Sequence, residues 1–181
     1  MQIQGISAIT DAEVSQYLTF KLADEEYGVD IMKVQEIRSW ETLTSIPNTP
    51  DFIVGVTNLR GIVVPIIDLR IRFDLDKVEY GGSTVVIVVK VNHKGGERIM
   101  GIVVDAVSEV YQITEEMIRE TPELGGAISL EFIKGLATID DKMIIMLDID
   151  LLVSPEHLKI QEADIKKINV KAKDVKEKEV H

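Results

Sequence analysis

Residue types that commonly carry catalysis or bind metals are few and scattered in this chain of 181 residues. It has no cysteine, which excludes thiolate catalysis, disulfides and cysteine metal sites. The three histidines, His93, His157 and His181, lie far apart, so neither a metal cluster nor a catalytic triad is predicted. The acidic pairs Glu115–Glu116 and Asp140–Asp141 fall in expected turns, where a solvated role is favoured. We therefore predict no catalytic residue, no cofactor and no metal.

Composition narrows the class of partner. The formal net charge is −11 at pH 7, and an acidic body repels nucleic acid and anionic membrane surfaces. The longest apolar run, "VVIVV" at 85–89, is far shorter than the roughly 20 residues of a membrane-spanning helix. The N-terminal segment has neither the basic nor the apolar region of a signal peptide. We expect a cytoplasmic protein that binds no nucleic acid and does not insert into the membrane.

The chain contains an internal repeat. "FIVGVTNLRGIVVPIIDL" (52–69) aligns without a gap on "FIKGLATIDDKMIIMLDI" (132–149), 80 positions further on. Upstream, "YGVDIMKVQEI" (27–37) aligns on "MGIVVDAVSEV" (100–110) at a spacing of 73, in the same order. This pattern indicates one structural unit used twice.

One arginine breaks the repeat. The segment 55–69 reads as a strand, a tight turn and a second strand, with Arg60 at the tip. Matched positions such as Gly55/Gly135 and Asp68/Asp148 serve the shared fold, whereas Arg60 falls on Asp140. Because the sister turn forms without an arginine, we interpret Arg60 as a contact to another molecule.

Each unit consists mainly of predicted strands. The runs 17–22 and 84–91 have strand-like patterns, and turn signals separate such runs. The segments 30–37 and 103–110 are each interpreted as a strand with a short turn. Several short strands per unit without βαβ alternation predict an all-β fold of two small packed β-barrels. We place the barrels at 14–80 and 81–153, divided near "EYGGS" (79–83), followed by a helix at 154–168 and a charged, disordered tail at 169–181.

The sequence closely resembles the CheW family of bacterial chemotaxis coupling proteins. The resemblance covers roughly residues 14–155 and rests on four stretches: "DEEYGVDIMKVQEIR" (24–38), "IPNTPDFIVGVTNLRGIVVPIIDLRIRF" (46–73), "VVIVV…GIVVDAVSEV" (85–110) and "EFIKGLATIDDKMIIMLDIDLL" (131–152). It implies two five-stranded, SH3-like β-barrels and a non-catalytic adaptor. The implied partners are the cytoplasmic tips of methyl-accepting chemotaxis receptors and the regulatory domain of the histidine kinase CheA. Through these receptor arrays the protein would lie at the inner face of the membrane.

The resemblance also implies two groups of functional positions. The positions implied in receptor coupling are Val34, Glu36, Gly55 and Arg60. The positions implied in coupling or kinase association are Val85, Val86, Gly101, Val107 and Gly135. The alternative is that these five residues serve the core of the fold. Glu36 has a matching Glu109 in the second unit, so the repeat makes a weaker case for Glu36 than for Arg60.

Two other functions remain open at this stage. One is a CheW-like regulatory module of a different two-component assembly, which would share the fold. The other belongs to a different class, a small β-barrel hydrolase that uses carboxylates. A screen for hydrolytic activity would separate the second from an adaptor.

Overall fold

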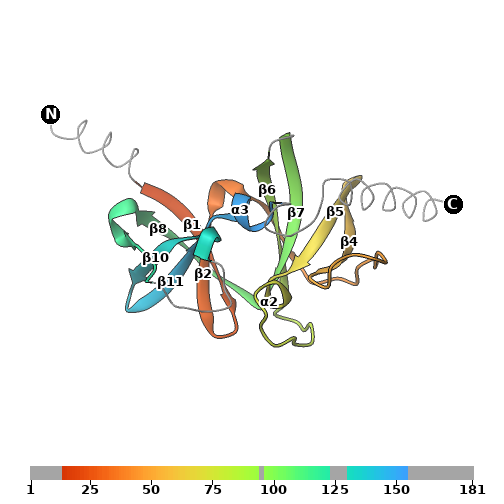
Figure 1. The fold of residues 1–181 in the computed structure, drawn as a ribbon, viewed down its shortest axis with the longest axis horizontal. Helices are drawn as coiled ribbons and strands as arrows, with labels where there is room; N and C mark the ends of the chain where they lie inside the picture. The colour runs from red at the N-terminus through yellow and green to blue at the C-terminus, as the bar shows by residue number, and fades with distance from the viewer. Residues whose placement is uncertain (1–13, 94–95, 123–129, 155–181) are drawn as a thin grey trace.

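The computed structural model describes residues 14–93, 96–122 and 130–154, which fold into two β-sheets (Figure 1). Sheet A lies to the left in Figure 1, and its spatial order is β8 (Ala106–Thr114), β1 (Val14–Leu22), β2 (Glu25–Asp30), β11 (Lys142–Leu147), β10 (Ile133–Ile139) and β9 (Ile118–Arg119). Sheet B lies to the right, in the order β3 (Val34–Ser39), β6 (Val85–His93), β7 (Gly96–Val104), β5 (Ile62–Asp68) and β4 (Ile53–Leu59). The described helices are single turns: η1 (Ile31–Lys33), α2 (Leu69–Arg72), η2 (Glu115–Met117), η3 (Leu130–Phe132) and α3 (Ile149–Leu152).

The predicted all-β class is therefore confirmed. Five strands is the correct number for sheet B, and sheet A adds the two-residue strand β9. The counterpart of β9 in sheet B is a single bridge between Thr44 and Val56. Apart from Ser154, the helix predicted at 154–168 and the tail at 169–181 lie outside the described residues.

The 80-residue repeat forms equivalent strand pairs in separate sheets. Strands β4 and β5 pair in sheet B, and β10 and β11 pair with the same register in sheet A, including a register shift before Gly55 and Gly135. The Asp68 N–H donates to the Phe52 carbonyl at 2.8 Å, and the Asp148 N–H donates to the Phe132 carbonyl at 2.8 Å. Both aspartates then cap the short helix that follows.

The two halves exchange hairpins. The first hairpin, β1–β2, joins β8–β11 of the second half, while β6–β7 joins β3–β5 of the first half. The chain crosses between the sheets at η1, before β3, and again at Asp105, before β8. Both crossings are short turns followed by a strand, as predicted for 30–37 and 103–110. The division at 79–83 thus marks the repeat in the sequence, whereas each sheet draws strands from both halves.

Each sheet curls because its two edges are joined by the chain. Strand β8 lies at one edge of sheet A, and the chain continues through η2 to β9 at the opposite edge. In sheet B, the chain beyond β3 reaches Thr44, which bonds Val56 of β4 at the opposite edge through two N–H···O contacts of 3.1 and 2.9 Å. The barrel-like shape of each sheet follows from this connection.

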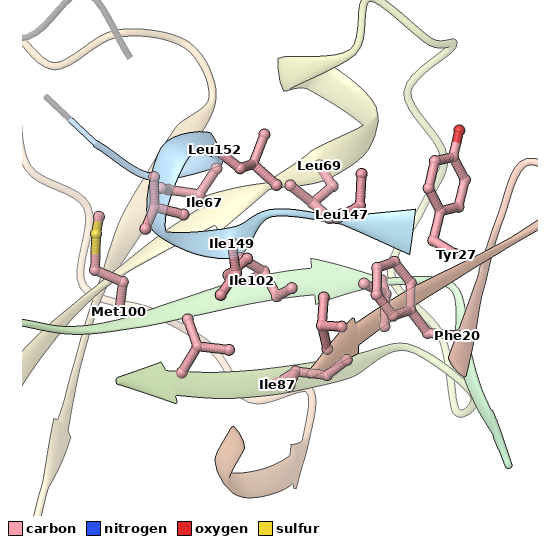
Figure 2. Packing of buried hydrophobic residues seen from close by; sticks show 14 of the residues in the cluster. Phe20, Tyr27, Ile67, Leu69, Ile87, Met100, Ile102, Leu147, Ile149 and Leu152 are labelled. Carbon is pink, nitrogen blue, oxygen red and sulfur yellow. The ribbon is translucent and has the colours of Figure 1, made fainter. Parts of the chain in front are cut away.

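The largest buried cluster lies between the sheets (Figure 2). Figure 2 shows Leu147, Ile149 and Leu152 of sheet A and α3 packed over Ile67 of β5 and Ile102 of β7. Each sheet also has a smaller cluster on its other face: one includes Leu59, Val64, Ile66 and Val88, and the other includes Tyr17, Ile113, Ile144 and Met146. Since β-strand side chains alternate between faces, central strands such as β5, β6 and β11 each contribute to two clusters. The sheets are therefore held together by a core they share.

The segment that divides the repeat is fixed to sheet B. Tyr80 stacks on Trp40 with ring centroids 3.9 Å apart, and its hydroxyl donates to Asp68 Oδ2 at 2.6 Å. Burial, together with the bond to Asp68, raises the pKa of the Tyr80 hydroxyl above its ordinary value. A hydroxyl that stays protonated keeps donating its hydrogen bond to Asp68. The segment around Tyr80 is therefore packed against sheet B.

Acid should weaken a polar contact at the crossing before β8. Burial alone would raise the pKa of Asp105, but hydrogen bonds from the Arg70 guanidinium and the Ala23 N–H outweigh it, and the net pKa lies below its ordinary value. A lowered folded-state pKa stabilises the fold above the unfolded-state pKa, and this contribution disappears as the pH falls through the folded-state pKa. We expect Asp105→Asn to cost about 2 kcal/mol at pH 7. Urea melts at pH 6 and pH 3 should show a smaller loss of stability in the variant; an equal loss in both proteins would contradict this assignment.

Candidate partner-binding surface

Strand β3 and the β4–β5 turn supply the polar side chains of the candidate site. Along β3, Glu36 pairs with Val88 and Arg38 pairs with Val86, both buried residues of the smaller sheet B cluster. Paired residues in an antiparallel ladder project to the same face. Glu36 and Arg38 therefore extend from the rim of that cluster, with their side chains 28% and 29% exposed.

Arg60 projects from a rigid turn. Its φ of 53° and that of Gly61, 88°, are both positive, as a two-residue type I′ hairpin requires. The Asn58 side chain accepts the Gly61 N–H at 2.8 Å and fixes the turn. The Arg60 side chain is 83% exposed. A turn held by its own backbone thus presents a cation to solvent.

An ion-pair network joins this turn to β3. Arg60 Nη2 lies 3.6 Å from Glu36 Oε2, and Arg38 lies 3.8 Å from Glu36 and 3.6 Å from Glu41. Because β3 and β4 are the opposite edges of sheet B, the curl of the sheet brings Glu36 and Arg60 together. Exposed pairs at these distances contribute little to stability, so both groups keep most of their capacity to bind another protein. Ile62, two residues beyond Arg60, adds an apolar side chain that is half exposed. We call Glu36, Arg38, Arg60 and Ile62 the coupling surface.

The sister turn of sheet A has the same backbone and the opposite charge. Asp140 and Asp141 have φ values of 49° and 63°. Glu109, the counterpart of Glu36, accepts a hydrogen bond from Tyr111, which raises the pKa of the Tyr111 hydroxyl. The two matching glutamates therefore have different partners, which the sequence repeat alone did not reveal.

The other expected functional residues are mainly packed against neighbours. Val34 and Val107 lie against the core between the sheets, as does Val85 at the start of β6. Val86 is 4% exposed and belongs to the sheet B cluster. A Cβ on Gly101 would collide with Ile66 Cδ1 and lie 2.9 Å from Val86 Cγ1. Among the expected functional residues, the structure therefore places Glu36 beside Arg60, and Gly101 against Val86.

Gly55 and Gly135 allow the chain to pass close behind each sheet edge. Both have a φ of 154°. A Cβ on Gly55 would lie 2.7 Å from the Thr44 carbonyl oxygen, and one on Gly135 would lie 2.5 Å from that of Arg119. These are the points where each barrel-like sheet closes, so the two glycines have the same packing role.

Sheet A holds a buried carboxylate that sequence reasoning did not single out. Glu26 on β2 is only 9% exposed, its Oε2 has no hydrogen-bond partner, and its Oε1 lies 3.9 Å from Lys142 Nζ. The repeat places Ile99 at the matching position, within the apolar contacts of sheet B. An incompletely paired buried carboxylate lowers stability.

We expect Glu26→Ile to raise the free energy of unfolding by about 1 kcal/mol, because the apolar side chain removes that penalty. Urea denaturation at pH 7 measures the change. Glu26→Gln serves as the control of similar size that keeps a polar group. A less stable Glu26→Ile protein would show that the carboxylate contributes to the fold.

The described residues contain no group of three or more His, Cys, Asp or Glu side chains placed to hold a metal ion. Among these residues, no helix is long and apolar enough to cross a membrane. The candidate site is the partly exposed surface of charged side chains and Ile62 beside the β4–β5 turn of sheet B.

Comparison with known proteins identifies the class to which this fold and surface belong. The CheW-like domain family matches residues 16–157. The chemotaxis protein CheW of Klebsiella aerogenes is 48% identical over 84% of this chain and 90% of its own length. A probable chemotaxis protein CheW of Rhizobium etli is 37% identical over 77% of this chain and 87% of its own. The crystal structure of the scaffolding protein TtCheW from Thermoanaerobacter tengcongensis superposes with a TM-score of 0.68 at 38% identity, covering 77% of this chain and 88% of that one.

The fold and the matches define a non-catalytic scaffolding protein of chemotaxis. The chain belongs to the CheW family. This confirms the resemblance found in the sequence and the prediction of an adaptor that is not an enzyme.

Proposed function

We propose that the protein couples the cytoplasmic tips of chemoreceptors to the regulatory domain of the histidine kinase CheA. Family membership supports the coupling role. The observation that carries the proposed site is Arg60, an 83% exposed guanidinium on a turn whose geometry does not depend on that side chain. By binding receptor arrays, the protein would be held at the cytoplasmic face of the membrane.

Within this proposal, the expected functional residues form two groups: exposed residues that contact the receptor, and packed residues that hold the exposed ones in place. Glu36 and Arg60 are direct receptor contacts, since the Arg60 side chain is 83% exposed and the Glu36 side chain beside it is 28% exposed. Val34 and Gly55 position the strands that carry them. Val86, Gly101 and Gly135 act through packing, and the partly buried Val85 and Val107 act on kinase association through their contacts with the core between the sheets.

A reconstituted kinase assay tests the proposal. We expect the protein to increase CheA autophosphorylation when receptor signalling fragments are present, and to have no effect without them. The protein assayed alone, for phosphotransfer and for hydrolysis, serves as the blank. Equal stimulation with and without receptor would contradict a bridging role, and stimulation of a different kinase alone would assign the protein to another two-component assembly.

A further inference from the structure

A groove opens on sheet B beside the end of β3, on the face that carries the smaller cluster of that sheet. Its volume is about 390 Å³, within the range of roughly 300–1,000 Å³ that is usual for ligand sites. We call it the Trp40 groove. Its lining includes Trp40, Leu43, Val54 and Tyr80, which also contact the smaller cluster, and the charged Asp51 and Lys77.

One wall of the groove is aromatic and held in place. Trp40 stacks on Tyr80 with ring centroids 3.9 Å apart, and the Tyr80 hydroxyl donates to the buried Asp68 at 2.6 Å. The Trp40 backbone N–H donates to the Thr84 carbonyl at 3.1 Å. Trp40 is nevertheless only partly buried. A ring that is already fixed loses little conformational entropy when it binds an apolar group, so this wall is a preformed contact surface.

The groove also carries two opposite charges that are not neutralised. Asp51 and Lys77 are both exposed. They form no ion pair with each other, nor with any other residue in the part of the chain that the structure describes. A ligand with one positive and one negative group on either side of an apolar centre would therefore complement the groove.

Two segments that border the groove have unused backbone groups. Residues 41–43 and 77–79 belong to no helix or strand. Across the described ranges of the chain, none of their N–H or C=O groups accepts or donates a hydrogen bond. An extended peptide can bond to such groups through its own main chain, whereas a helix has already satisfied its backbone internally. The backbone thus favours an extended ligand over a helical one.

The aromatic wall is specific to one half of the repeat. At the spacing of 73, Trp40 falls on Ile113, which is 1% exposed and packs inside the sheet A cluster. Tyr80 lies in the connection that divides the repeat. Because the sister sheet has a buried isoleucine at this position, the shared fold does not require a partly exposed indole here.

We propose that the Trp40 groove docks an extended segment of a partner protein. An apolar side chain of that segment packs on Trp40, between a basic residue that meets Asp51 and an acidic residue that meets Lys77. The groove is distinct from the coupling surface, because it lies beyond the end of β3, whereas Glu36 and Arg60 meet near the start of that strand. The site therefore adds a docking function to the proposed coupling of receptor and kinase.

A peptide selection tests the chemistry of the docked segment. A phage library of random heptapeptides would be selected on the full-length protein and on a charge-exchanged variant, Asp51→Lys with Lys77→Asp. Glu116→Lys with Lys134→Glu is the matched control, since it exchanges two exposed charges of sheet A. Both variants keep the net charge, and thermal melts verify that they fold. We expect the wild-type and control proteins to select one basic–apolar–acidic consensus, and the charge-exchanged variant to select the opposite order of charges.

Fluorescence then locates the bound peptide, because Trp40 is the only tryptophan in the chain. A synthetic peptide with the wild-type consensus and no tryptophan should change the Trp40 emission and bind the charge-exchanged variant about tenfold more weakly. The absence of a consensus, the same consensus from the charge-exchanged variant, or binding without a change in Trp40 emission would overturn the proposal.

The coupling assay separates this site from the proposed function. The charge-exchanged variant should stimulate the receptor-bound kinase as well as the wild-type protein does, since neither Asp51 nor Lys77 belongs to the coupling surface. A loss of stimulation in this folded variant would make the groove part of the coupling site and would overturn the assignment of a separate partner. Failure of the wild-type protein to stimulate the kinase would contradict the coupling role and leave the peptide result standing.

Discussion

Gly135→Ala is expected to lower the free energy of unfolding by about 3 kcal/mol, among the largest effects of any single methyl group in this protein. Two physical costs add at this position. The backbone has a φ of 154°, which L side chains rarely adopt, and the new Cβ would lie 2.5 Å from the Arg119 carbonyl oxygen and 2.6 Å from Ile118 Cγ2. Strand β9 would have to move away from β10, where Leu136 pairs with Arg119. The closure of sheet A would then be lost first.

A thermal melt measures this effect directly. For a domain of this size, the expected loss corresponds to a decrease in Tm of about 6–12 °C. Gly82→Ala is the matched control, since its Cβ would meet nothing within 4 Å. If Gly135→Ala melts like the control, the close approach to Arg119 does not restrict this site. If Gly135→Ala is destabilised as expected, poor kinase coupling by Gly135 variants is explained by the damage to sheet A.

The repeat made much of the fold predictable from the sequence. Matching Phe52 to Phe132 and Gly55 to Gly135 located the equivalent strand pairs, because packing and close approach require the same residue types in both copies. The exchange of hairpins was not predictable in this way. It follows from where the strands end, because the connections of residues 31–33 and of Asp105 are too short to lead back over a strand of the same sheet.

The candidate site was predictable where the two copies differ. Arg60 stood out because its counterpart is Asp140, and the structure places it on an exposed turn. Its contact with Glu36 could not be foreseen, since it depends on the curl of sheet B.

Arg60→Asp is expected to fold normally and to weaken receptor binding by about thirtyfold, equivalent to about 2 kcal/mol. The sister turn already places aspartate at this position, with a φ of 49° at Asp140 against 53° at Arg60, and aspartate tolerates such backbone well. Stability should therefore change by less than about 0.5 kcal/mol, the range of exposed substitutions. The reversed charge would lie beside Glu36 and make the coupling surface acidic, so an acidic or carbonyl-rich receptor tip would be repelled.

The control variants separate charge from shape. Arg60→Ala removes the guanidinium without adding a carboxylate, so its binding should fall between those of the wild-type and Arg60→Asp proteins. Asp140→Ala changes the equivalent tip of sheet A and should leave receptor binding unchanged. Thermal melts with titrations of a receptor signalling fragment at two salt concentrations would test all three. The Arg60→Asp defect should be largest at low salt, because an exposed charge is screened within a Debye length of about 8–10 Å at physiological ionic strength. Wild-type affinity in a well-folded Arg60→Asp protein would make Arg60 a solvated turn residue, and the receptor would have to bind another face of the molecule.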